Sequence, residues 1–82
     1  MEHYLLVNIT FEIGSIRIYR LFGNRNQVFE RMKMVVLDEF NETVNLDEQL
    51  ESKGYKVHKE SGIIFNEDNE WKLIPESEIN NL

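Results

Sequence analysis

The sequence has 82 residues, no cysteine and a formal net charge of −6 at pH 7. This length predicts one domain, which would bury only about 60% of the surface that its unfolded chain exposes. The missing cysteines exclude disulfides and thiolate metal sites, and the N-terminal residues lack the features of a secretory signal. We therefore expect a soluble cytoplasmic protein. Its net negative charge disfavours direct binding to nucleic acids and to anionic membranes.

The first 22 residues predict a β-hairpin. Apolar and polar residues alternate from Tyr4 to Ile13, as in a strand with one buried face, and Gly14-Ser15 has the composition of a two-residue loop before a return strand over residues 16–22. The expected inward face of the first strand is Leu5, Val7, Ile9, Phe11 and Ile13. This loop predicts the cross-strand pairs Ile13–Ile16, Glu12–Arg17, Phe11–Ile18 and Ile9–Arg20.

Arg20 is the exception in this arrangement, because it falls on the apolar face. Its aliphatic stem could lie along the sheet margin with the guanidinium in water. Alternatively, Arg20 could anchor a carboxylate of a ligand or partner.

Two helices are expected in the middle of the chain. Asn24 or Asn26 can cap a helix that runs to about Phe40, and its apolar stripe is Val28, Phe29, Met32, Val35, Val36 and Phe40. Met34 and Leu37 lie outside this stripe, and we expect the second helix to cover them. That helix should span Leu46 to Lys53, with a capping box of Asn45 and Glu48 at its start and Gly54 after its end.

Three short strands are expected next, over residues 55–59, 63–65 and 70–74, with Pro75 ending the last one. Trp71 should pack in the core against Tyr55 or Val57. The order ββααβββ predicts an α+β fold with the helices packed on one face of a mainly antiparallel sheet. We expect one compact domain over residues 1–75, followed by a polar tail over residues 76–82.

Enzymatic and metal-binding motifs are missing from the sequence. It has no phosphate-binding loop, no nucleophile elbow and no H-E-x-x-H pattern. His58 and Glu60 are two residues apart on an expected strand and could share a face, but a metal site needs at least a third ligand. We expect a protein that is not an enzyme and needs no cofactor or metal.

The segment from Asp38 to Glu51 holds six carboxylates and neither lysine nor arginine. Asp47 and Glu48 suit the first turn of the second helix, whereas Asp38 and Glu39 lie in the last turn of the first, where the helix dipole disfavours negative charge. Charge without a local structural role suggests an acidic face for a basic partner protein. The candidate partner-binding residues are Asp38, Glu39, Glu42, Asp47, Glu51, Glu67, Asp68 and Glu70.

These carboxylates lead to a hypothesis of a small acidic protein-binding module. In its sharpest form it is a phage-type inhibitor that mimics DNA and occupies the nucleic-acid-binding surface of a basic host protein. The alternative is a regulatory or assembly module that forms a homodimer or larger homo-oligomer. It would use an edge strand, Tyr4 to Ile13 or Glu70 to Ile74, and an apolar patch of Met34, Leu37 and Trp71.

Overall fold

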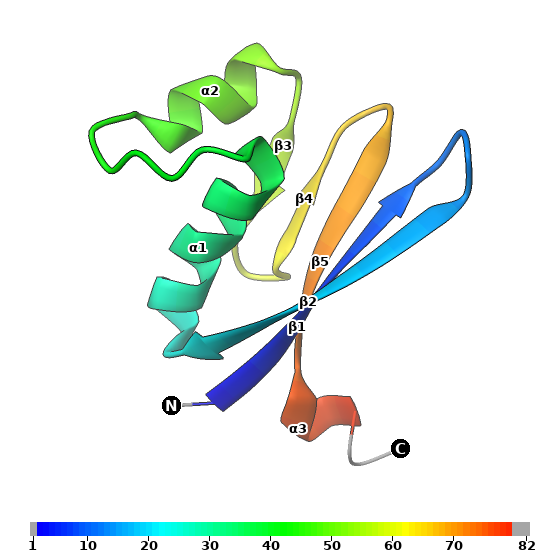
Figure 1. The fold of residues 1–82 in the computed structure, drawn as a ribbon, viewed down its shortest axis with the longest axis vertical. Coiled ribbons are helices and arrows are strands. Elements are labelled where there is room, and N and C mark those ends of the chain that lie inside the picture. Colours follow the sequence, from blue (N-terminus) through cyan, green and yellow to red (C-terminus); the bar gives the residue numbers. More distant parts are fainter. Residues whose placement is uncertain (1, 80–82) are drawn as a thin grey trace.

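The computed structural model describes residues 2–79 and has the predicted α+β fold. A five-stranded sheet has the order β2-β1-β5-β4-β3, in which all neighbouring strands are antiparallel (Figure 1). Helix α3 forms in the segment that was expected to be a polar tail. The elements are β1 (Glu2–Thr10), β2 (Ser15–Gly23), α1 (Arg25–Leu37), α2 (Leu46–Ser52), β3 (Lys56–His58), β4 (Ile63–Phe65), β5 (Asn69–Pro75) and α3 (Glu76–Ile79).

The hairpin of β1 and β2 has a different register from the predicted one. Thr10 pairs with Ser15, so the connection is a four-residue loop over residues 11–14 rather than Gly14-Ser15 alone. Arg17 lies opposite Asn8 instead of Glu12, and Arg20 lies opposite Leu5 instead of Ile9. The glycine is still needed in this loop, because Gly14 has a φ of 65°.

The two faces of the hairpin are also exchanged relative to the prediction. Tyr4 and Leu6 are buried under α1, whereas Phe11 and Ile18 are 52% and 62% exposed, so the predicted core pair Phe11–Ile18 is wrong. The cause is that β1 has apolar side chains on both faces, and alternation alone does not say which face turns inward. The inward face is the one on which Leu6 and its β5 partner Leu73 are both buried in the core with α1.

The N-termini of α1 and α2 are both capped by asparagine. The Asn24 side chain accepts a hydrogen bond from the Gln27 amide, and the Gln27 side chain accepts one from the Asn24 amide, which completes a capping box on α1. Asn45 accepts from the Glu48 amide at 3.1 Å at the start of α2. Of the two candidate caps for α1, Asn24 is therefore the one used.

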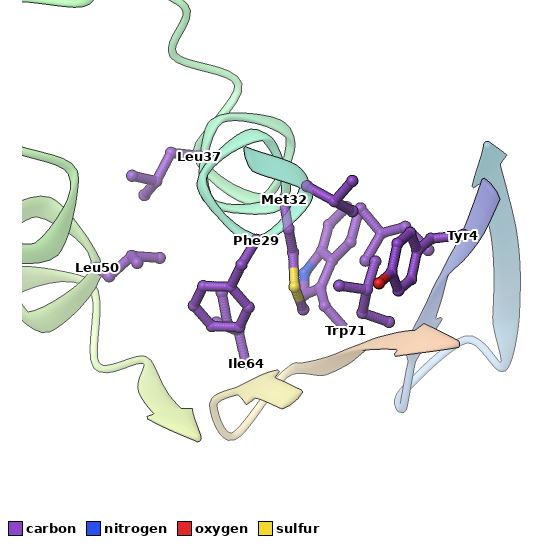
Figure 2. Packing of buried hydrophobic residues seen from close by; sticks show 10 residues of the cluster. Tyr4, Phe29, Met32, Leu37, Leu50, Ile64 and Trp71 are labelled. Atoms are coloured by element: carbon purple, nitrogen blue, oxygen red, sulfur yellow. The ribbon is translucent and has the colours of Figure 1, made fainter. Parts of the chain in front are cut away.

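Helix α1 ends earlier than the sequence predicts. Asp38 adopts the left-handed conformation at φ 51° and ends the helix three residues before Phe40. Phe40 is consequently outside the apolar stripe and 63% exposed, which corrects the prediction for this residue. Leu37 is buried and lies on the α2 side of α1, as expected (Figure 2).

The core lies between α1 and one face of the sheet (Figure 2). Trp71 is buried as predicted, but its ring stacks on Tyr19 at a centroid distance of 6.0 Å. The Asn69 side-chain oxygen accepts hydrogen bonds from the Trp71 indole at 2.8 Å and the Tyr55 hydroxyl at 3.3 Å, so the polar edge of the indole is satisfied. The buried apolar residues are Tyr4, Leu6, Val28, Phe29, Met32, Leu37, Leu50, Ile64, Trp71 and Leu73.

The strand order contradicts the edge strands that the sequence suggested. β1 lies between β2 and β5, and β5 lies between β1 and β4, so neither is an edge. The edges are β2 and β3. The apolar patch suggested with them is also wrong, since Leu37 and Trp71 are each only 7% exposed.

Candidate protein-interaction surface

The second face of the sheet is exposed over β2, β1 and β5. In strands, successive side chains point to opposite faces, so the residues between the buried positions point away from α1. Within residues 2–79, α3 is the one helix that touches the end of this face, through Glu76 and Ile79 near Leu5. We call this surface the outer face and define it by Leu5, Val7, Ile9, Ile16, Ile18, Arg20, Glu70, Lys72 and Ile74.

The strand pairing arranges the outer face in three rows. Each row has one residue from β2, one from β1 and one from β5: Ile16–Ile9–Glu70, then Ile18–Val7–Lys72, then Arg20–Leu5–Ile74. The first two rows are apolar on β2 and β1 and charged on β5. Ile16 and Ile18 are 64% and 62% exposed, so the β2 side is the most open apolar part of this surface.

Arg20 lies on this apolar face, where both sequence interpretations had placed it. Its Nε donates to the Glu76 carboxylate of α3 at 2.7 Å. The Arg20 side chain is 67% exposed, so this ion pair contributes little to stability. The carboxylate that Arg20 binds in this structure belongs to its own chain.

Asp47 has a structural role that the sequence did not reveal. The Lys33 ammonium of α1 lies 3.0 Å from the Asp47 carboxylate of α2 and 3.1 Å from that of Glu30. Burial lowers the pKa of Lys33, but the hydrogen bonds to Asp47 and Glu30 outweigh it and raise the pKa above 10.5. Asp47 thus joins the two helices.

The acidic residues around the α1–α2 connection are divided between local roles and solvent. Glu39 accepts a hydrogen bond from the Asn41 amide at 3.0 Å, and Asp38 forms the left-handed end of α1. Glu42 and Glu51 are exposed.

The remaining predicted carboxylates come from the β4–β5 hairpin and point in two directions. Glu67 and Asp68 are exposed in its turn, which adjoins the end of α2 across a hollow lined by Lys53 and Gly54. The turn and α2 lie at the same end of the molecule (Figure 1, top). Glu70 lies instead on the outer face. The structure therefore brings Glu51, Glu67 and Asp68 to one end, which we call the acidic end, and places Glu70 elsewhere.

His58 and Glu60 do not share a strand face, because β3 ends at His58 and Glu60 lies in the following turn. The His58 ring stacks on Phe65 at a centroid distance of 5.7 Å. Among the residues that the structure describes, no three histidine, aspartate or glutamate side chains are grouped as metal ligands.

A second hollow, of about 480 Å³, lies on the helix side of the sheet. Val35, Val36 and Phe40 contribute from α1 and the residues after it, and Tyr19 and Trp71 from the sheet. This hollow offers a partner less exposed apolar surface than the outer face does, because Trp71 is buried and Val35 and Val36 are partly covered.

Comparison with protein-family models, with curated proteins and with solved structures found no match to this chain. No helix within residues 2–79 has the length and apolar character needed to span a bilayer.

Proposed function

We propose that this protein is a non-enzymatic protein-binding module of the cytoplasm and that the outer face is its binding surface. The observation that carries the proposal is the exposure of Ile16 and Ile18, side by side with Val7 and Ile9 on one face of the hairpin. Contiguous exposed apolar surface rimmed by polar groups marks interaction sites, whereas scattered single residues do not.

Burial of this surface by a partner would contribute favourable free energy of binding. Fully burying an isoleucine side chain stabilises by about 1.5–3 kcal/mol relative to leaving it exposed. Since Ile16 and Ile18 each leave roughly 60% of that gain unrealised, a partner could recover about 2–3.5 kcal/mol from these two residues. The charged residues Glu70 and Lys72 at the rim would orient the partner.

Photo-crosslinking in cells tests the proposal. A photoreactive phenylalanine analogue replaces Ile18 in one variant and Val57 in a control. Val57 is a suitable control because it is 39% exposed and pairs with the buried Ile64, on the helix side of the sheet. We expect a protein adduct from position 18 and not from position 57. Equal adducts at both positions, or none at position 18, would contradict the proposal.

A second candidate function uses the acidic end and keeps the hypothesis of a DNA mimic that binds a basic protein. The observation in its favour is that α2 and the β4–β5 turn adjoin, with Glu51, Glu67 and Asp68 exposed there. Such a cluster would attract a Lys/Arg-rich groove over about one Debye length.

Neutralising the exposed acids tests this candidate. The variant changes Glu51, Glu67 and Asp68 to Gln or Asn, and its stability should stay within about 0.5 kcal/mol or rise. Binding to a basic DNA-binding protein should weaken and lose its salt dependence. Asp47→Asn is the contrasting variant, because it should affect stability through Lys33. Unchanged affinity and salt slope in the three-fold variant would make the acidic end a solubility surface only.

A further inference from the structure

We propose that the partner of the outer face is a second copy of this chain, stacked face to face about a two-fold axis. This inference rests on the proposed function, since it names the occupant of the same surface. The axis lies in the interface, perpendicular to the strands, and passes between the Ile16 row and the Ile18 row. Each strand then faces its own copy running in the opposite direction, with the sheets about 10 Å apart.

The pattern of the outer face is self-complementary under this axis. The Ile16–Ile9–Glu70 row of one copy faces the Ile18–Val7–Lys72 row of the other. Within these two rows, each facing pair on β2 and β1 is therefore apolar against apolar: Ile16 against Ile18, and Ile9 against Val7. A two-fold interface requires such self-complementarity, because the same patch is used by both copies and each residue must fit the residue that faces it in the other copy.

The charges on β5 fit the same arrangement. Glu70 of one copy faces Lys72 of the other, and the pair occurs twice. Within residues 2–79, neither Glu70 nor Lys72 takes part in an ion pair of its own chain. Both residues can therefore form these pairs without breaking another one.

The size of the outer face corresponds to a weak, reversible dimer. β1 and β2 have nine residues each, which corresponds to a length of about 30 Å. Three strands at a spacing of about 4.8 Å span about 14 Å, so the area of this face is roughly 400 Å². Two copies would bury about 800 Å² in total, and somewhat more with the relief of the side chains, which corresponds to a weak and reversible dimer.

The net charge of −6 is not concentrated on the outer face, because several of the carboxylates belong to the helix layer. The helix layer carries Glu30, Asp47, Glu48 and Glu51, and it faces solvent in the dimer. The nine residues of the outer face include two basic side chains, Arg20 and Lys72, and one acidic one, Glu70.

Analytical ultracentrifugation of the purified protein tests the proposal over about 1–300 µM, the range in which an interface of this size associates. We expect a monomer–dimer equilibrium. Ile18→Asp should raise its Kd by at least about 100-fold, because each dimer would bury two carboxylates among apolar side chains. Val57→Asp, the matched change on the helix side, should leave the Kd within about twofold. Circular dichroism and thermal melts establish that both variants are folded.

A charge-exchange experiment tests the register without relying on Ile18→Asp. Glu70→Lys and Lys72→Glu should each weaken self-association by about tenfold, because each homodimer would bring like charges together twice. An equimolar mixture of the two variants should restore the wild-type dimer content, since every facing pair in the heterodimer has opposite signs. A mixture that stays monomeric would overturn the stacked arrangement.

The remaining outcomes separate this inference from the proposed function. A wild-type protein that stays monomeric at all concentrations overturns the second copy as partner, but an adduct to another protein at position 18 would leave the proposed function intact. A dimer that persists in Ile18→Asp would use another surface and overturns the inference. The absence of both the dimer and the adduct overturns both.

Discussion

Two adjacent leucines test which face of β1 turns inward. Leu6 is fully buried beneath α1 and pairs with Leu73, while Leu5 is half-buried on the outer face beside α3. The change Leu→Ala removes the same three carbon atoms at both positions. The difference between the two variants in unfolding free energy therefore reports burial alone.

The magnitudes follow from the two environments. At Leu6, the lost transfer free energy is about 2.4 kcal/mol, at about 0.8 kcal/mol per carbon. The enclosed cavity raises the total to about 3–4 kcal/mol. At Leu5, roughly half of the transfer free energy is lost and no enclosed cavity forms, so we expect about 1 kcal/mol. A domain of this size has a total stability of roughly 4–12 kcal/mol, so the loss at Leu6 should leave a measurable folded population.

Urea denaturation followed by the fluorescence of Trp71 measures both values. The slope of free energy against urea should be the same in both variants, so that the shift in midpoint gives the change in stability. Midpoints that agree at two protein concentrations, tenfold apart, ensure that self-association does not contribute. A cost at Leu5 equal to or larger than that at Leu6 would show that the hairpin presents the opposite face to α1, and the argument for the outer face would be wrong.

Three further predictions concern the core, a helix cap and alkaline pH. The emission of Trp71 should be blue-shifted and resistant to acrylamide, because its ring is 7% exposed; a solvent-like maximum would contradict its place in the core. Asn24→Ala should cost about 1 kcal/mol in chemical denaturation because it removes the α1 cap, whereas Asn26→Ala, two positions inside the helix, should cost nothing; equal costs would refute the capping assignment. Burial and a hydrogen bond with Glu2 raise the pKa of Tyr4 above 10.0, and the carboxylates around Lys33 raise the pKa of that residue above 10.5. Both groups hold their protons more tightly in the folded state, so their contribution is complete below about pH 10 and is lost as the pH rises through the raised pKa values. Melting temperatures should therefore stay constant between about pH 8 and 9.5 and fall above about pH 10, and a melting temperature that rises in this range would contradict the assignment.

The features that the sequence predicted correctly have local signals. Each of the asparagine caps lies within three residues of the amide that it binds, and Gly54, expected after α2, has a φ of 78°. The β4–β5 turn is likewise local, because Asn66 accepts hydrogen bonds from the amides of Asp68 and Asn69. Element order and the α+β class follow from such signals without knowledge of tertiary contacts.

The features that the sequence did not predict depend on distant residues. The inward face of β1 is the one that packs with α1 and with Leu73 of β5, about 67 residues after Leu6. Leu5 and Leu6 are both apolar, so the local sequence does not show which of them turns inward. The role of Asp47 depends on Lys33, which is 14 positions away on another helix. The outer face was missed for the first of these reasons, because Ile18 was assigned to the core.

The position of β5 in the sheet has a consequence for synthesis of the protein. β5 is the last strand in chain order, yet it lies in the middle of the sheet, where Tyr4 pairs with Pro75. The sheet therefore remains in two parts until residues 69–75 have left the ribosome, because β5 lies between β1 and β4. During translation at roughly 5–20 residues per second, the nascent hairpin would expose both of its apolar faces for several seconds. Such long-range pairing also makes folding slow compared with helical domains of this size. Nascent chains should consequently depend on chaperones or on early pairing with another hairpin until residues 69–75 emerge.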